Sequence, residues 1–93
     1  MWDNFYPMGA DVAFEIARIL AALQLPLDAL RYYKESLRLF GPHHATFYNM
    51  GICLYQLQQP QEALRFMDRS LALKPDYARA REWRNRLQAE LGG

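Results

Sequence analysis

Cysteine is almost absent from this chain: Cys53 is the single one in 93 residues. A single cysteine excludes a disulfide within the chain and most cysteine-based metal sites. Apolar runs are short, and none approaches the roughly 18–20 residues that span a bilayer. The opening stretch "MWDNFYPMG" has no basic segment followed by an apolar one, so we expect no signal peptide. These absences favour a cytoplasmic protein that does not enter a membrane.

Net charge is also lacking. Eleven Lys and Arg residues are matched by ten Asp and Glu residues, which leaves a net charge of +1. A nearly neutral chain exerts no global attraction on nucleic acid or anionic lipid. The charge is uneven along the chain, with one basic and four acidic side chains in residues 1–30 and ten and six in residues 31–93. The hydrophobic content of 52% is sufficient for the core of one small domain.

An internal repeat is the main feature that the sequence does contain. The segment "LPLDALRYYKESLRL" at residues 25–39 is followed by "QPQEALRFMDRSLAL" at residues 59–73. Alignment of residues 20–39 with residues 54–73 gives ten identities in twenty, at a constant offset of 34 and without a gap. Chance would match roughly one or two positions, so we read the chain as a repeat protein.

Helix signals divide the chain into five segments and leave no strand. Helices are expected over residues 10–24, 26–40, 44–58 and 61–73, with a fifth that ends near residue 91. Pro26 suits a first helical turn, where its missing N–H is not needed. The stretch "GPHH" ends the second helix, and Asp76 is expected to cap the fifth.

Apolar residues recur within each segment at the spacing of one helix face. This spacing predicts the inner faces, which are Ala13, Ile16, Ala17, Leu20 and Leu23; Ala29, Leu30, Tyr33, Leu37 and Phe40; Phe47, Met50, Leu54 and Leu57; Ala63, Leu64, Met67 and Leu71; and Ala80, Leu87 and Leu91. Arginines on the last segment would give a terminal helix the polar outer side that it needs for solubility.

Residues 44–77 resemble a tetratricopeptide repeat, whose length is 34 residues. The stretch "FYNMGICL" supplies Phe47 for the family's large aromatic, Met50-Gly51 for its Leu-Gly and Leu54 for its tyrosine. Ala63 stands at the alanine, Met67 at the phenylalanine and Pro75 at the final proline. Gly51 and Ala63 are small, so the two helices of a pair can approach closely.

The resemblance implies an all-α fold, a right-handed helical-repeat array (an α-solenoid) of two helix-turn-helix repeats and a capping helix. We expect an N-terminal aromatic segment at residues 1–9, a degenerate repeat at 10–43, a second repeat at 44–77 and the capping helix at 78–93. About three repeats normally make an autonomous array. Two repeats and a cap therefore leave open a role as a self-assembly element of a larger repeat protein or of a homo-oligomer.

Catalytic and cofactor chemistry has no visible basis in the sequence. The adjacent residues His43 and His44 point in different directions along a helix and have no cysteine or carboxylate at ligand spacing. Cys53 is expected to be a buried filler inside a helix. The glycines are scattered, so no phosphate-binding loop is present. We expect no enzymatic activity, no cofactor and no metal.

The resemblance implies a concave groove, lined by the first helix of each pair, that takes an extended peptide or a partner's helix. The groove positions carried over from the family are Asp11, Phe14, Glu15 and Arg18; Tyr48, Asn49, Ile52, Tyr55 and Gln56; and Arg79, Trp83 and Arg86. Aromatic residues outside the packing pattern are typical of a protein-binding surface. The other interpretation is that these rings pack against each other or against "MWDNFYP".

Tyr48 and Tyr55 are expected to point into the groove beside Asn49 and Gln56, whereas Ile52 meets the neighbouring helix. Replacement of both tyrosines by alanine should then change stability by no more than about 1 kcal/mol. The set of Lys, Asn and Arg residues with which some members of the family grip a chaperone's terminal carboxylate is matched poorly, and we do not predict that binding mode.

Two other functions stay open from the sequence. A homo-oligomer could form through the N-terminal edge, where Trp2, Phe5 and Tyr6 would cover the first helix within one chain or across a dimer. A nucleic-acid adaptor could use Trp83 and the arginines of the last helix, which are Arg79, Arg81, Arg84 and Arg86. Glu82 and Glu90 dilute that basic surface, so a protein or peptide is the preferred partner.

Overall fold

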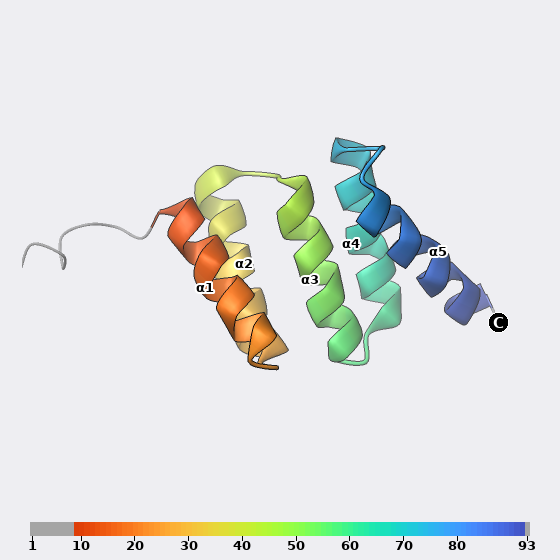
Figure 1. Ribbon diagram of the computed structural model, residues 1–93, viewed down its shortest axis with the longest axis horizontal. Helices are drawn as coiled ribbons and strands as arrows, with labels where there is room; N and C mark the ends of the chain where they lie inside the picture. Colours follow the sequence, from red (N-terminus) through yellow and green to blue (C-terminus); the bar gives the residue numbers. More distant parts are fainter. Residues whose placement is uncertain (1–8, 93) are drawn as a thin grey trace, which may run out of the picture.

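A computed structural model describes residues 9–92 of the chain. These residues form five α-helices and no strand: α1 (Ala10–Ala22), α2 (Pro26–Phe40), α3 (His44–Gln56), α4 (Pro60–Leu73) and α5 (Ala78–Gly92) (Figure 1). The expectation of an all-α fold is confirmed. The first and third helices end about two residues earlier than the sequence pattern predicts.

The helices form two hairpins and a final helix. α1 packs along α2, α3 packs along α4, and α5 packs on α4, while α2 and α3 join the two hairpins. In Figure 1, α1 and α3 lie side by side toward the viewer, with α2 and α4 behind them and α5 crossing in front of α4. The described chain is elongated, with extents of 55 × 26 × 16 Å. This arrangement is a helical-repeat array, as expected from the sequence.

The turns within the two hairpins have the same hydrogen bonds. At the end of α1, Leu25 N donates to Leu20 O and Gln24 N donates to Ala21 O, at 2.9 and 3.0 Å. The residues 34 positions later repeat both bonds at the same distances at the end of α3. These bonds are a Schellman motif, which places its C′ residue in the left-handed region. That residue is Gln24 in the first turn and Gln58 in the second, each with φ of +64°.

The remaining helix boundaries follow from local chemistry. Pro26 and Pro60 stand in the first turn of α2 and α4, as predicted for Pro26. Gly41 follows α2 with φ of +99°, a region that favours glycine, which explains why "GPHH" ends the helix. The prediction for Asp76 is wrong. α5 begins at Ala78, Tyr77 directly precedes it, and the Asp76 carboxylate instead lies 3.5 Å from Nζ of Lys74.

α3 and α4 approach each other closely at Gly51. A Cβ atom at this position would lie 2.8 Å from Cε of Met67 and 3.3 Å from the carbonyl oxygen of Ala63. A larger side chain would therefore require Met67 to move and would press on the backbone of α4. The prediction that Gly51 and Ala63 permit close contact is confirmed.

Most of the predicted inner faces form the core. The buried apolar residues are Ala13, Ala17, Ala29, Leu30, Tyr33, Met50, Cys53, Leu54, Ala63, Met67, Ala80 and Leu87. Three predicted core residues are instead exposed: Leu23, Phe40 and Leu91, at 63%, 65% and 37%. Each lies at or just beyond the end of its helix, where no neighbouring helix remains to cover it.

Candidate functional site

Reactive chemistry is not apparent in the described residues. Burial raises the pKa of the Cys53 thiol to about 11, so this cysteine is an inert core residue, as predicted. Burial, together with the nearby charges of His43 and Lys74, lowers the pKa of His44. Residues 9–92 contain no cluster of His, Cys, Asp and Glu that could hold a metal ion.

The predicted groove residues of α1 lie on one side of that helix. Phe14 is half-buried, and its ring packs edge-on against Tyr33, with a centroid distance of 5.6 Å. Asp11, Glu15 and Arg18 are exposed, and Oε1 of Glu15 lies 3.5 Å from Nε of Arg18. Both partners of this ion pair are solvated, so it is easily exchanged for another contact.

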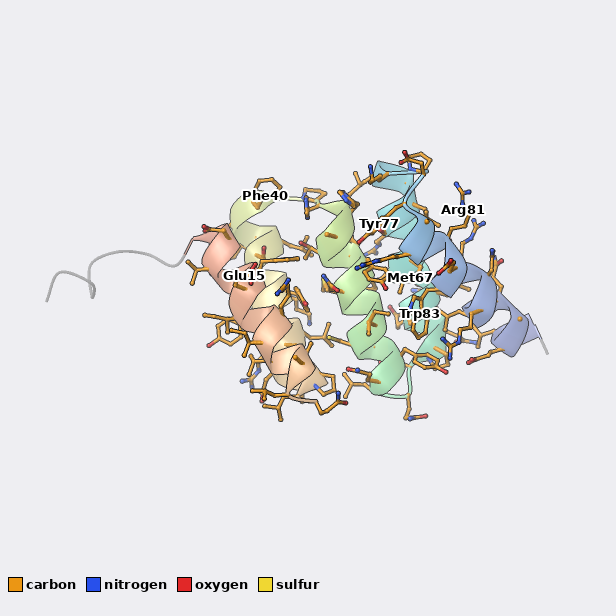
Figure 2. The ribbon with its side chains drawn as sticks, in the orientation of Figure 1. Glu15, Phe40, Met67, Tyr77, Arg81 and Trp83 are labelled. Atoms are coloured by element: carbon orange, nitrogen blue, oxygen red, sulfur yellow. The ribbon has the colours of Figure 1, made fainter. Side chains whose placement is uncertain are left out.

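The two tyrosines of α3 contact the last helix and the residue before it. The Tyr48 ring packs edge-on against Tyr77 at 5.4 Å, and the Tyr55 ring packs against Trp83 at 5.0 Å. The Tyr55 hydroxyl donates a hydrogen bond of 3.1 Å to Oε2 of Glu90. In Figure 2, Tyr77 and Trp83 lie between the ribbons of α3 and α5. Both tyrosines are half-buried, so part of each ring packs inside the fold.

Each of these tyrosines is followed in the sequence by an amide residue, Asn49 or Gln56, whose side chain has no hydrogen-bond partner among the described residues. Asn49 is half-buried and Gln56 is exposed, and within residues 9–92 neither side chain makes a hydrogen bond or an ion pair. Ile52 is half-buried and packs against the core. Asn49 and Gln56 therefore retain donors and acceptors for an external ligand.

The α5 residues are largely engaged within the chain. The Arg86 guanidinium lies 4.6 Å from the centroid of the Trp83 ring, and Nη2 of Arg81 donates to the carbonyl of Pro75 at 2.6 Å. Trp83 is thus half-buried between Arg86 and Tyr55. Arg79 is exposed at the start of α5 and has no such contact among the described residues.

The structure also contains a pocket that the sequence patterns did not predict. It has a volume of about 220 Å³ and lies where α1, α2 and the start of α3 meet. Its lining consists of Asp11, Phe14, Glu15, Ser36, Phe40, His43 and Thr46. Three of these were assigned to the groove, whereas Phe40 was assigned to the core and His43 to no role.

His43 contributes an aromatic ring to the pocket wall. Its ring lies 5.5 Å from the Phe40 ring and 6.3 Å from the Phe14 ring, edge-on to both. The Thr46 hydroxyl lies 3.4 Å from Nδ1 of His43 and is buried. The wall is therefore aromatic, and the two carboxylates of α1 stand at its side (Figure 2 labels Glu15 and Phe40).

A separate apolar surface lies on the outer edge of the first hairpin. Val12, Ile19 and Leu23 are spaced by seven and four residues and so share one side of α1, and Leu27 follows at the start of α2. All four are exposed, at 48%, 58%, 63% and 62%. We call these four residues the edge stripe. The expected cover by Trp2, Phe5 and Tyr6 lies outside the described residues.

Comparison with known proteins agrees with the geometry. None of the helices in residues 9–92 is long and apolar enough to cross a membrane. A search of curated proteins finds no match to the chain. The sequence profile of the tetratricopeptide repeat matches residues 10–76, which is well over half of the chain. Together with the two equivalent helical hairpins, this match shows that the chain belongs to the tetratricopeptide repeat family.

Proposed function

We propose that this protein is a non-enzymatic interaction module that binds a peptide or a partner's helix along the face formed by α1, α3 and α5. Tetratricopeptide repeats generally mediate protein–protein interaction and are typically not enzymes. We further propose that residues 10–43 and 44–77 are the two repeats and that residues 78–93 are the cap. The remaining question is which side chains would hold the partner.

The observation that carries the proposal is the pair of amides on α3. Asn49 and Gln56 have no partner within residues 9–92, and they stand beside the half-buried rings of Tyr48 and Tyr55. An extended peptide needs donors and acceptors for its backbone and flat apolar contact for its side chains. The rings supply that contact and are already ordered by Tyr77 and Trp83, so binding would cost little side-chain entropy.

Nucleic-acid binding through α5 is less well supported. A base would stack on a free aromatic face, but Trp83 is half-buried between Tyr55 and Arg86. Arg81 is held by the Pro75 carbonyl, and Arg86 lies 4.0 Å from Glu90. Two of the four arginines on this helix are therefore already engaged within the chain.

A second candidate function is self-association through the edge stripe. An apolar side of this kind normally packs on the next repeat. The outer side of α5 offers no apolar counterpart, since its exposed residues are mostly Arg, Gln, Asn and Glu. Two copies would therefore meet edge stripe to edge stripe, in an isologous dimer. Sedimentation of the full chain and of an Ile19→Glu variant over a range of concentrations would test this candidate, because only the parent should then dimerise.

A selection experiment tests the proposed groove. A display library of random dodecapeptides is selected on the immobilised chain, and the selected peptides are then assayed on two variants. Asn49→Ala/Gln56→Ala removes the free amides, and the control Gln61→Ala/Asp68→Ala changes exposed residues of α4. Peptides should bind the parent and the control but not the groove variant. Equal binding to all three proteins would contradict the proposal.

A further inference from the structure

The pocket between α1, α2 and α3 can be compared with a second place in the same chain. The repeat offset of 34 residues makes the junction of α3, α4 and α5 equivalent to the junction that holds the pocket. Residues 34 positions apart occupy corresponding places in the two junctions. Asp11, Glu15 and Phe40 correspond to Ala45, Asn49 and Lys74. His43 corresponds to Tyr77, and Ser36 corresponds to Ser70, which is identical in type.

Aromatic side chains pack together in the second junction. The Tyr77 ring lies 4.8 Å from the His44 ring and 5.4 Å from the Tyr48 ring, edge-on to both. In the first junction the smaller His43 ring stands at the position of Tyr77, at 6.3 Å from Phe14, and a pocket of about 220 Å³ is left. The first junction therefore has a smaller ring at this position and a pocket beside it; we call the first junction open and the second closed.

The chemistry of the open pocket differs from that of the closed junction in charge. Its lining holds two carboxylates and no Lys or Arg, whereas the second junction has Lys74 and no carboxylate at the corresponding positions. Asp11 and Glu15 are one helical turn apart, a spacing at which like charges repel. A cation placed between them would relieve this repulsion. Among the described residues, the Glu15 carboxylate forms an ion pair with Arg18, and an exposed pair of this kind contributes little free energy.

The volume of the pocket and its aromatic wall indicate which kind of cation would fit. Small-molecule sites commonly measure about 300–1,000 Å³, so a pocket of about 220 Å³ suits a single side chain. Phe14 and Phe40 offer apolar surface for a methylene stem and ring faces for a cationic head. Phe40 is 65% exposed although it is aromatic, so one side of its ring is free for such a contact.

We propose that this pocket binds a Lys or Arg side chain of the partner, with the stem against Phe14 and Phe40 and the charged head at Asp11 and Glu15. This inference rests on the proposed function, because the same three α1 residues line the proposed groove. A basic residue in this pocket would also fix the direction in which the partner lies along the groove. A basic residue would lie at the α1 end of the groove, away from the exposed Arg79 at the start of α5.

The test uses two short probe peptides that differ in one charge. Ac-Gly-Gly-Lys-Gly-Gly-NH2 and its norleucine analogue are titrated into the ¹⁵N-labelled full chain, and amide shifts are recorded by NMR. The lysine peptide should shift the amides of Asp11, Glu15, His43 and Thr46 and should bind about threefold to tenfold more tightly than the norleucine peptide. Equal binding of both peptides, or shifts elsewhere, would overturn the proposal.

Three variants identify the groups responsible. Asp11→Asn/Glu15→Gln should remove the preference for lysine, whereas the control Glu62→Gln, which breaks a similar exposed pair with Arg65, should retain it. His43→Tyr places the residue of the closed junction in the open one and should abolish binding while the chain still melts cooperatively. If that variant does not fold, Phe40→Lys decides instead, since its exposed ammonium would compete for the same carboxylates. Unchanged lysine binding in Asp11→Asn/Glu15→Gln would overturn the proposal. Unchanged lysine binding in His43→Tyr, or in Phe40→Lys if His43→Tyr does not fold, would overturn it as well.

The two experiments separate an error in the proposed lysine pocket from an error in the proposed groove. If the lysine probe does not find the pocket while library-selected peptides still require Asn49 and Gln56, the pocket inference is wrong and the groove stands. If the probe fills the pocket but selected peptides ignore both amides, the groove on α3 is wrong.

Discussion

Gln24 and Gln58 stand 34 residues apart and adopt the same left-handed backbone conformation, each with φ of +64°. Each is the C′ residue of a Schellman motif whose hydrogen bonds are the same in both hairpins. Such a conformation is unfavourable for a residue with a Cβ atom and is normal for glycine. The two repeats therefore share a local strain as well as a sequence pattern.

Gln58→Gly should stabilise the protein. Relief of the left-handed conformation should raise the free energy of unfolding by up to about 1 kcal/mol. Gln59→Gly is the matched control, because Gln59 has φ of −123° and gains nothing from glycine. Urea denaturation should show the first variant above the parent and the second at or below it. A destabilised Gln58→Gly would show that the turn depends on the glutamine side chain.

Gly51→Leu should destabilise the second hairpin strongly. A Cβ atom alone would already stand 2.8 Å from Cε of Met67 and 3.3 Å from a backbone oxygen. Overpacking of this kind costs about 1–3 kcal/mol or more. Ala89→Leu, at an exposed position of α5, is the control and should melt like the parent. A thermal melt in which both variants match the parent would refute the close helix contact.

The packing of α5 on the second hairpin should depend more on Leu87 than on Leu91. Leu87 is fully buried, whereas Leu91 is 37% exposed at the end of α5. Leu87→Ala should lower the free energy of unfolding by about 2–5 kcal/mol. Leu91→Ala has less to lose and should cost distinctly less. If the two variants were equally stable in chemical denaturation, α5 would not be packed on α4 as described.

Tyr55 and Trp83 should be energetically coupled. Their edge-on contact at 5.0 Å is of a kind worth about 0.5–1.5 kcal/mol beyond the area that it buries. A double-mutant cycle with Tyr55→Ala and Trp83→Ala should recover a coupling free energy in that range. Tyr55→Phe should keep most of this coupling, since it loses only the hydrogen bond to Glu90. Additive effects of the two alanine variants would mean that the rings do not support each other.

This coupling changes how the tyrosines can be used as probes of the groove. From the sequence, Tyr48 and Tyr55 are expected to be dispensable for folding. Their contacts with Tyr77 and Trp83 instead give their replacement by alanine a cost in stability. Loss of binding in a tyrosine variant would then have two explanations. Asn49 and Gln56 are better probes, because their amides make no hydrogen bond or ion pair within residues 9–92.

The fold was predictable because its determinants are local or repeated. The offset of 34 is visible in the sequence itself, and the prolines act on the first turn of their own helices. The small residue at Gly51 acts on the other helix of its own hairpin. The exposure of Leu23 and Phe40 was not predictable in this way. A helical spacing gives the direction of a side chain but does not say whether a neighbouring helix extends far enough to cover it.

The candidate site was predicted only in part, for the same reason. The groove positions come from the family resemblance. The pocket arises from a difference between two junctions, His43 in one and Tyr77 in the other, and this difference has meaning only when three helices meet. Comparison of the two repeats position by position is the sequence signal that could have drawn attention to Phe40 and His43, which the groove prediction did not include.

The central claim is that a partner lies along α1, α3 and α5. It is tested most directly by NMR titration of the ¹⁵N-labelled chain with a dodecapeptide selected on the parent protein. The account predicts that the largest amide shifts will fall on α1 and α3 around Glu15, Asn49 and Gln56, with smaller ones near Arg79. Shifts concentrated on α2 and α4, with these residues unperturbed, would contradict it.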